Sequence, residues 1–223
     1  MSKIFITASG TEVGKTFVTR ALINQLRKNG RSVHALKPIA TGFKSEDNKL
    51  SDTKLLLHAL GLDADVQGID NITPWRFREA LSPDMAAARE QTYIPFDKLI
   101  SFCEQENDRD VTLIEGIGGV MVPLDKKHLV LDWIAALQAP TLLIVGSYLG
   151  TLSHTLTAVS ALETGGVEII GIIVNESPNQ PVPSEESAEI IARFTKAIPI
   201  RVLHRTNQPE NAPDLLPLIV PYL

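Results

Sequence analysis

The chain has 223 residues and a formal net charge of −5, with 44% hydrophobic and 21% charged residues. This composition is typical of a globular protein with a sizeable core, and it gives no electrostatic footprint for nucleic acid or an anionic membrane. The only cysteine, Cys103, excludes an internal disulfide and favours a reducing compartment. We expect this cysteine to be a buried small hydrophobe.

The N-terminus carries one lysine and an apolar run that is too short for a signal-peptide core or a membrane-spanning helix. We therefore expect a cytoplasmic protein with neither a membrane nor a nucleic-acid partner. A length of 223 residues allows one large domain or two small ones.

A phosphate-binding loop is predicted near the N-terminus. Ile4–Ala8 has the composition of a short strand, a small polar loop follows, and a helical pattern begins near Lys15. In such a loop, backbone N–H groups and the positive end of the helix dipole form a concavity for phosphates. Lys15 would reach the terminal phosphates, and the Thr16 hydroxyl would hold Mg²⁺. Because Ser9 stands where the usual pattern has a glycine, an ordinary strand–helix turn is the alternative.

Helices and strands alternate along the rest of the chain. Helices are predicted over Thr16–Asn29, from Ser51, and over Ser82–Glu90, Phe96–Asn107, Leu131–Leu137, Thr151–Glu163 and Glu185–Lys196. Further strands are predicted over Ser32–Leu36, Val111–Ile114, Thr141–Val145, Ile169–Val174 and Ile200–Leu203. A polar loop is expected over Gly42–Lys49, and Asn71–Leu81 is not assigned.

Strands that are continuous Val, Ile and Leu runs, alternating with helices, indicate a mostly parallel sheet covered on both faces. The chain has no internal repeat and no linker that would divide it. We therefore expect a single doubly wound α/β domain of the phosphate-loop (P-loop) NTPase type over residues 1–223.

Ligands of such a sheet bind at the carboxyl ends of the strands. Later strands deliver Lys37, Glu115 and Asn175 to that rim, where they should converge with the phosphate loop. A second lysine beside Lys15 indicates that the site holds more negative charge than ATP alone carries. An anionic substrate or intermediate would supply this additional charge. The alternative for Lys37 is a snorkelling edge lysine. As a rim residue it is expected to contribute little to the stability of the folded state.

Two carboxylates and one helix start are further candidates. Glu115 ends an apolar strand, and the glycines after it would let the backbone approach a ligand closely. A carboxylate opposite Lys15 suits Mg²⁺, and a solvated turn carboxylate is the alternative. For Asp52, at a helix start, capping is the simpler interpretation. Capping is also the default for Thr151, although its helix N-terminus could receive a substrate carboxylate.

Taken together, these segments resemble the dethiobiotin synthetase family over nearly the whole chain. The order of the Lys-Pro-x-x-[Ser/Thr]-Gly and Glu-Gly-x-Gly-Gly elements after the phosphate loop makes the resemblance specific. The segments that carry it are Thr11-Glu12-Val13-Gly14-Lys15-Thr16, Lys37-Pro38-Ile39-Ala40-Thr41-Gly42, Ser51-Asp52, Glu115-Gly116-Ile117-Gly118-Gly119 with Pro123-Leu124, Leu149-Gly150-Thr151, Val174-Asn175 and Pro209-Glu210-Asn211-Ala212.

The resemblance implies an ATP- and Mg²⁺-dependent ligase that condenses CO₂ with 7,8-diaminopelargonate and closes the ureido ring of dethiobiotin. One substrate amine would add CO₂ to give a carbamate, and the carbamate would take the γ-phosphoryl group of ATP. The second amine would then attack this carbamic-phosphoric anhydride and release phosphate, leaving ADP as the other product. The resemblance also implies a homodimer in which the diamine lies across the subunit interface.

The resemblance also implies roles for individual residues. Lys15 would serve the phosphates, and Lys37 the carbamate and the charge that develops during transfer. Mg²⁺ would be bound by Thr16, Asp52 and Glu115, and this role replaces the capping interpretation of Asp52. The implied nucleotide contacts are Glu12, Val13, Gly14, Lys15, Thr16, Phe17, Asp52, Glu115, Gly116, Ile117, Gly118, Asn175, Glu176, Leu203, His204, Arg205 and Glu210. The implied substrate contacts are Thr11, Thr41, Gly150 and Thr151, the last two reaching the partner's site.

The chain departs from the family pattern in three places, and two other protein classes share parts of it. Ala8, Ile117 and Ser153 stand where the family usually has glycine, alanine and asparagine. A switch ATPase of the partition or division-site kind typically carries a second lysine early in the phosphate loop, and Ser9–Val13 contains none. A glutamine-dependent amide ligase of the cobyrinate type needs an added amidotransferase domain, for which we expect no room.

Overall fold

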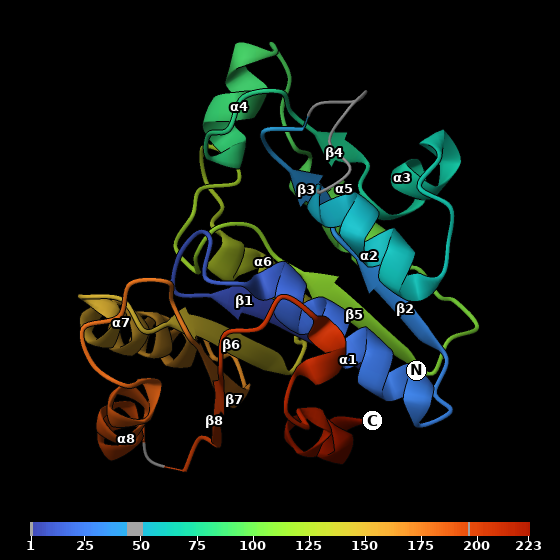
Figure 1. The fold of residues 1–223 in the computed structure, drawn as a ribbon. Coiled ribbons are helices and arrows are strands. Elements are labelled where there is room, and N and C mark those ends of the chain that lie inside the picture. The colour runs from blue at the N-terminus through green and yellow to red at the C-terminus, as the bar shows by residue number, and fades with distance from the viewer. Residues whose placement is uncertain (1, 44–50, 196) are drawn as a thin grey trace.

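The computed structural model describes residues 2–43, 51–195 and 197–223, and its central layer is a six-stranded sheet (Figure 1). The strand order is β2-β5-β1-β6-β7-β8, and every neighbouring pair is parallel. The predicted parallel α/β sheet is therefore confirmed. The strands are β1 (Ser2–Ala8), β2 (Val33–Leu36), β5 (Val111–Glu115), β6 (Thr141–Gly146), β7 (Ile169–Asn175) and β8 (Ile200–Leu203).

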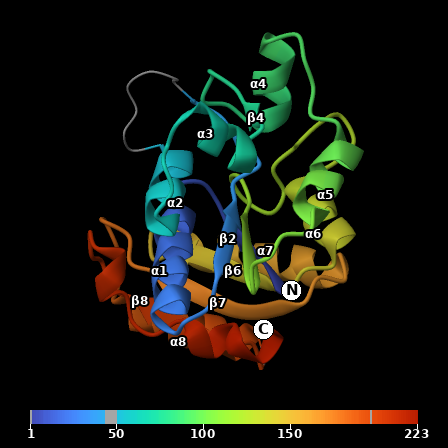
Figure 2. The ribbon, with the colours of Figure 1, turned by 90° about the vertical axis from the view of Figure 1, so that its right-hand side faces the viewer.

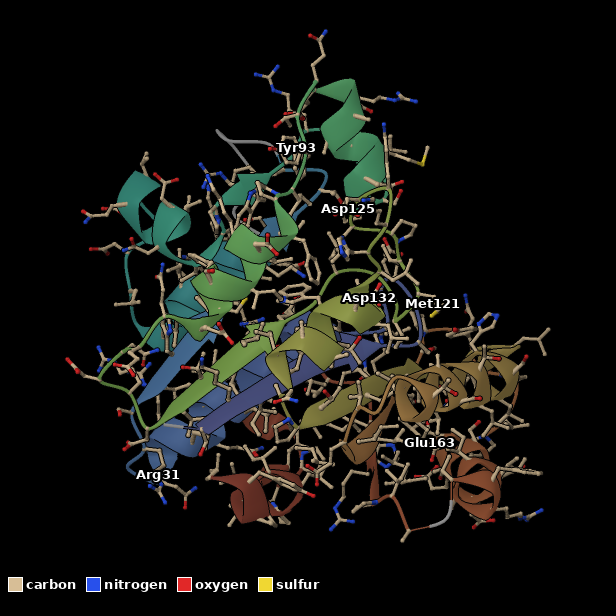
Figure 3. The ribbon with its side chains drawn as sticks, turned by 180° about the vertical axis from the view of Figure 1, so that it is seen from behind. Arg31, Tyr93, Met121, Asp125, Asp132 and Glu163 are labelled. Carbon is tan, nitrogen blue, oxygen red and sulfur yellow. The ribbon has the colours of Figure 1, made fainter. Side chains whose placement is uncertain are left out.

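Helices cover both faces of the sheet (Figure 2). On one face, α1 (Lys15–Lys28) packs on β1, β2 and β5, with α2 (Asp52–Leu60) beside it. The other face carries α5 (Phe96–Glu104), α6 (Val130–Leu137) and α7 (Thr151–Thr164), seen from behind in Figure 3. This arrangement buries every residue of β5 and β6, which explains why these strands are continuous apolar runs.

The chain order decides which face each helix covers. The connection from β1 to β2 runs toward one edge of the sheet, whereas β5, β6, β7 and β8 follow one another toward the other edge. Right-handed crossovers therefore place α1 on the face opposite to α6, α7 and α8 (Ser184–Phe194). The direction reverses around β1, so the first strand delivers its loop to the point where such sheets bind ligands.

A smaller layer stands beyond the carboxyl ends of the main strands, at the top of Figure 1. It contains the short parallel pair β3 (Ile39–Ala40) and β4 (Trp75–Arg76), together with α3 (Val66–Ile72) and α4 (Pro83–Arg89). The sequence analysis did not assign β3, β4 or α3. Strands of two residues have no alternation to detect, and α3 is a short helix that begins where the Asp65 side chain accepts a hydrogen bond from Gly68 N at 2.7 Å.

The remaining elements follow the predicted pattern with small shifts at their ends. The helix predicted over Phe96–Asn107 ends at Glu104, because Gln105 is extended and the Asn107 side chain bonds to His34 and Thr112. Cys103 is buried, as expected. Most of the loop predicted over Gly42–Lys49 and the last residue of the helix predicted to end at Lys196 lie outside the described residues.

The C-terminal segment packs on α1. It forms three short 3-10 turns, η1 (Pro209–Asn211), η2 (Leu216–Leu218) and η3 (Val220–Tyr222). The Gln25 side chain donates to Pro213 O at 2.8 Å and accepts from Leu215 N at 2.9 Å. Within the described ranges, the structure contains no helix with both the length and the apolar character needed to cross a bilayer.

Candidate active site

The phosphate loop leaves β1 at the carboxyl edge of the sheet, between β5 and β6. Gly14 has φ 96°, and a Cβ at this position would overlap the Asn175 amide, which donates to Val13 O at 2.8 Å. Only glycine fits this conformation and this contact. The Val13 side chain is buried, so Val13 can contact a ligand only through its backbone.

The missing glycine of the usual pattern has a local explanation. Ala8 is a buried strand residue that accepts from Val120 N at 3.0 Å, and Ser9 N still bonds to Ile144 O at 3.0 Å. Neither residue has a positive φ. The positive φ angle that precedes Gly14 in the loop falls on Glu12, with φ 59°. Ala8 is therefore the last residue of β1, Ser9 keeps a backbone hydrogen bond to β6, and the turn conformation lies later in the loop.

Lys15 crosses the loop and has no carboxylate partner in direct contact among the described residues. Its Nζ donates to Gly118 O at 2.8 Å and to Gly10 O at 3.4 Å. Burial, together with the nearby Lys37 charge, lowers the pKa of Lys15 to about 8. A phosphate would supply the opposite charge that this buried ammonium lacks.

The Glu115 carboxylate is the centre of the site. It is fully buried, and its Oε1 atom accepts from Thr16 Oγ1 at 2.7 Å and from Lys37 Nζ at 2.9 Å. Lys37 Nζ also donates to Gly116 O at 2.7 Å and lies 3.7 Å from the Asp52 carboxylate. The expected convergence of the strand ends is therefore found. The solvated-carboxylate alternative for Glu115 is wrong.

Lys37 does not snorkel into solvent. Its side chain is only 3% exposed and is fixed by Glu115 and Gly116. Burial would lower the pKa of Lys37, but the Glu115 and Asp52 carboxylates outweigh burial and hold this pKa above its usual value. Lys37 is therefore a charged and immobilised group, and its burial beside Glu115 argues against the expectation that it contributes little to folded-state stability.

Sequence reasoning missed one member of this network. Thr19 is fully buried on α1, and its hydroxyl lies 2.9 Å from Glu115 Oε2 and 3.0 Å from Lys15 O. The available signal was its position three residues after Thr16, which puts both hydroxyls on one face of the helix. A buried helical threonine is ordinarily a packing residue, so this signal was weak.

The oxygen atoms around Glu115 fit a magnesium ion. Thr16, Asp52 and Glu115 offer hydroxyl and carboxylate oxygens, which are hard ligands of the kind that Mg²⁺ takes. No group of three or more His, Cys, Asp or Glu side chains that could hold a metal occurs in the described residues. Mg²⁺ needs only one or two protein carboxylates, because this ion usually keeps waters and binds phosphate oxygens for its remaining positions.

The glycines after Glu115 serve the protein's own packing. A Cβ on Gly116 would lie 2.9 Å from the Phe5 ring, and Gly118 has φ 59°. A Cβ on Gly119 would lie 3.1 Å from Ser9 O and 3.2 Å from Gly10 N. These contacts give the glycines a packing role, while the close approach of a ligand to this backbone stays a prediction. They bring the Glu115 segment against the phosphate loop.

A second group of candidates lies where β7 and β8 end side by side. Asn175 and Leu203 are register partners, and Glu176 accepts from Arg205 N at 3.0 Å. Leu203 is buried, so only its backbone could meet a ligand. Glu176 and His204 line a cavity of about 430 Å³. The remaining residues predicted for the nucleotide comprise Glu210, which accepts from Asn24 at 3.1 Å, and the half-buried Phe17 and Ile117.

The candidates for the substrate lie around the rim. Thr41 is half-buried just after β3, and Thr11 is exposed in the phosphate loop. Gly150, with φ 97°, precedes α7. The Thr151 side chain is buried and donates to Gly146 O at 2.5 Å, so a ligand at this helix start would meet backbone N–H groups and the exposed Ser153 rather than the Thr151 hydroxyl.

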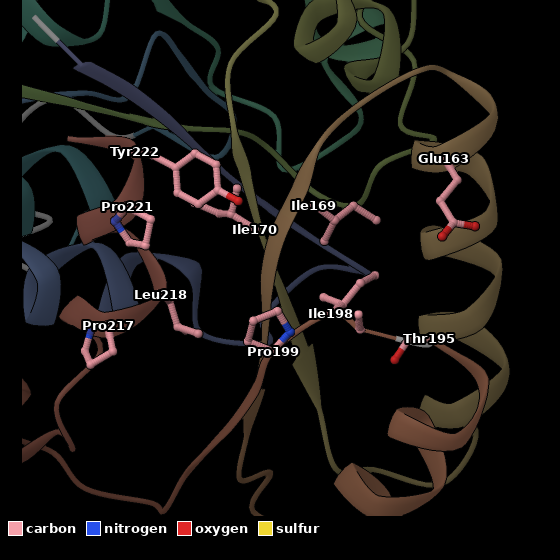
Figure 4. A pocket seen from close by; sticks show the side chains of 11 residues that line it. Glu163, Ile169, Ile170, Thr195, Ile198, Pro199, Pro217, Leu218, Pro221 and Tyr222 are labelled. Atoms are coloured by element: carbon pink, nitrogen blue, oxygen red, sulfur yellow. The ribbon is translucent and has the colours of Figure 1, made fainter.

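A further cavity, of about 470 Å³, lies away from this site (Figure 4). It opens near Ile169 and Pro199, where β7 and β8 begin, and is therefore at the opposite edge of the sheet. Among the described residues, its lining consists mostly of Ile, Pro and Leu side chains, with Glu163, Thr195 and Tyr222 as the polar members.

Comparison with known proteins identifies the family. A family model described as an AAA domain matches residues 2–208. The chain is 46% identical over 202 residues to the ATP-dependent dethiobiotin synthetase BioD of Acidiphilium cryptum, covering 89% of this chain and 91% of that protein. The chain belongs to the dethiobiotin synthetase family. The synthetase BioD of Methylobacterium nodulans is 41% identical over 224 residues, covering 97% of this chain and all of that protein.

Solved structures show that this chain shares its fold with more distant proteins. The cell division ATPase MinD of Pyrococcus furiosus superposes with a TM-score of 0.56 and 19% identity, over 92% of this chain and 84% of that one. Chloroplast FtsY of Physcomitrella patens gives a TM-score of 0.53 and 14% identity, over 99% of this chain and 64% of that one. At these identities the likeness shows the P-loop NTPase fold alone.

Proposed function

We propose that the protein is an ATP-dependent dethiobiotin synthetase that closes the ureido ring of dethiobiotin from 7,8-diaminopelargonate and CO₂. The observation that carries this proposal is the pair of buried lysines at one strand-end rim. Lys15 lies in the phosphate loop, and Lys37 is held by Glu115 on the neighbouring strand. Two fixed ammonium groups suit a reaction in which an anionic intermediate meets the γ-phosphate of ATP.

The nucleotide and its metal would be held by the residues around Glu115. Lys15 and the backbone of the phosphate loop would bind the phosphates, and Thr16, Asp52 and Glu115 would hold Mg²⁺. The bound ion would neutralise negative charge on the phosphate oxygens. Asn175, Glu176 and the Leu203–Arg205 segment lie at the adjacent strand ends, where they would face the base.

The proposed reaction passes through a carbamate and a mixed anhydride. One amine of the diamine adds to CO₂ and loses a proton, which gives the carbamate anion. Its oxygen attacks the γ-phosphorus and ADP leaves. The second amine attacks the carbamic carbon, which closes the ring and expels phosphate. Lys37 is fixed beside Asp52, where its charge would stabilise the carbamate and the transferring group.

We further propose that the enzyme is a homodimer with a composite active site. Leu149 is 84% exposed just before α7, and Met121 is 52% exposed at the molecular surface (Figure 3). Gly119 packs on Gly10 of the phosphate loop, so Met121 follows a segment that borders the site. Leu149 and Met121 are therefore the apolar side chains that we propose for the contact with the partner subunit. We also propose a cytoplasmic location, which agrees with the free thiol of Cys103.

The test is turnover measured with and without each substrate. ATP hydrolysis should require both the diamine and bicarbonate, and dethiobiotin should form in a one-to-one ratio with ADP. The switch-ATPase alternative instead predicts hydrolysis without the diamine, stimulated by DNA or lipid. That second pattern, with no dethiobiotin detected by mass spectrometry, would overturn the proposal.

A further inference from the structure

One oxygen of the Glu115 carboxylate has no part in the proposed function. Oε1 faces Thr16 and Lys37, whereas Oε2 lies 2.9 Å from the Thr19 hydroxyl. Glu115 and Thr19 are both fully buried. Among the described residues, the Thr19 hydroxyl is the group that donates a hydrogen bond to Oε2. A buried carboxylate oxygen depends strongly on its donor, because an unsatisfied charged group inside a protein is costly.

The geometry of α1 makes Thr19 suitable for this contact. It follows Thr16 by three residues, so the two hydroxyls lie on one face of the helix and reach the same carboxylate. Each hydroxyl contacts a different oxygen of Glu115, and two contacts of this kind fix the plane of the carboxylate. The Thr19 hydroxyl has one proton, and the ionised carboxylate is a stronger acceptor for it than the nearby carbonyl of Lys15.

We propose that Thr19 is a positioning residue for the metal site, and that it holds Glu115 with Oε1 turned toward Thr16 and Lys37. This inference rests on the proposed function, which assigns Mg²⁺ to Thr16, Asp52 and Glu115. Ligand carboxylates in metal sites are oriented by hydrogen bonds from groups that do not touch the metal. Losing such a partner typically reduces metal affinity by about 10–100-fold.

Three variants separate orientation from packing. Thr19→Val removes the hydroxyl but keeps the branched shape, and Thr19→Ser keeps the hydroxyl. Thr155→Val is the matched control, because Thr155 is also fully buried in a helix but its Oγ1 has no partner among the described residues. All three variants are made in the full chain.

The first measurement is the Mg²⁺ concentration that half-maximally tightens binding of a fluorescent ADP analogue. Thr19→Val should raise this concentration by about 10-fold or more, whereas Thr19→Ser and Thr155→Val should leave it near the parent value. Binding of the analogue in EDTA should be similar for all variants. No diamine or bicarbonate is used, so a parent enzyme that forms no dethiobiotin refutes the proposed function without affecting this result.

The second measurement is a metal-free crystal structure of Thr19→Val. The Glu115 carboxylate should turn away from the orientation set by the two threonines. If Thr19→Val is less stable but shows the parent Mg²⁺ titration and an unmoved carboxylate, Thr19 is a packing residue and the proposal fails. Should Thr19→Val not fold, Thr19→Cys, which keeps a weak donor, should give an intermediate shift in the titration. An unchanged titration for that variant would also overturn the proposal.

Discussion

At the scale of single residues, the site is organised by one buried carboxylate. Glu115 joins two helical hydroxyls and a lysine from another strand, although these residues are far apart in the sequence. The rule that ligands bind at strand ends was sufficient to predict that Lys37 and Glu115 converge at one edge of the sheet. It could not predict their mutual ion pair or the Thr19 contact, because a sequence does not show which side chains share a hydrogen bond.

The ion pair gives a prediction for Lys37. Replacing it with Met removes the partner of a fully buried carboxylate, and breaking such a pair typically costs about 3–5 kcal/mol. Urea unfolding should therefore show a large loss of stability in Lys37→Met, together with a kcat reduced by about 10²–10³-fold. Adding Glu115→Gln to Lys37→Met should recover part of the stability but none of the activity. A Lys37→Met variant as stable as the parent would contradict this account of the ion pair.

The pKa of Lys15 predicts a pH effect on nucleotide binding. Free Lys15 titrates near pH 8 because it is buried beside Lys37, and a bound phosphate raises that pKa by supplying a negative charge. Below this pH the lysine is charged before and after binding. Above it, binding must take up a proton, so the affinity for ADP falls as the pH rises, by up to about tenfold per unit.

Calorimetry in two buffers of different ionisation enthalpy tests this directly. ADP binding without Mg²⁺ should take up a fraction of a proton at pH 7 that grows toward one proton at pH 9. Lys15→Met should bind more weakly and lose this uptake. Equal proton uptake in the parent and in Lys15→Met would assign the linkage to another group.

At the scale of elements, sequence patterns were reliable where a segment is long and strongly apolar. All six strands of the main sheet were predicted, because burial on both faces requires continuous apolar runs. The layer formed by α3, β3 and β4 was not predicted. The two-residue strand β3 follows Lys37 and Pro38, and it pairs with β4 only because the chain returns at Trp75, which is a long-range contact that no local pattern records.

The contact between the Glu115 segment and the phosphate loop predicts the effect of Gly119→Ala. A Cβ would lie 3.1 Å from Ser9 O, which is tighter than an ordinary contact, so the two backbones must separate slightly. Because the phosphate loop is one of them, nucleotide affinity should fall by about 10-fold with only a small loss of stability. Gly30→Ala is the control: its Cβ would meet nothing within 4 Å, but φ is 74°, so it should lower stability alone. Equal nucleotide affinity in both variants would contradict this account.

At the scale of the whole molecule, the composite site proposed above depends on the position of the α7 start. The phosphate loop and Lys37 lie at the strand ends, while the start of α7 lies beside them with Leu149 exposed to solvent. Helix starts bind carboxylates through free N–H groups. A diamine with a carboxylate tail could therefore meet ATP in one subunit and the start of α7 in its partner. The sequence supplied this arrangement only by resemblance, because no pattern within one chain records a symmetric contact.

Subunit mixing tests the composite site. Lys37→Met disables the reaction centre, and Gly150→Val disables the start of α7, because Gly150 has φ 97° and a β-branched residue does not adopt this conformation. Each variant alone should be nearly inactive. In a mixed dimer, one of the two sites combines an intact Lys37 with an intact partner helix. Random mixing makes about half of the dimers mixed, so activity should recover to roughly a quarter of the parent value.

If native mass spectrometry shows mixed dimers but turnover does not recover, each site lies within one subunit and the composite arrangement is wrong.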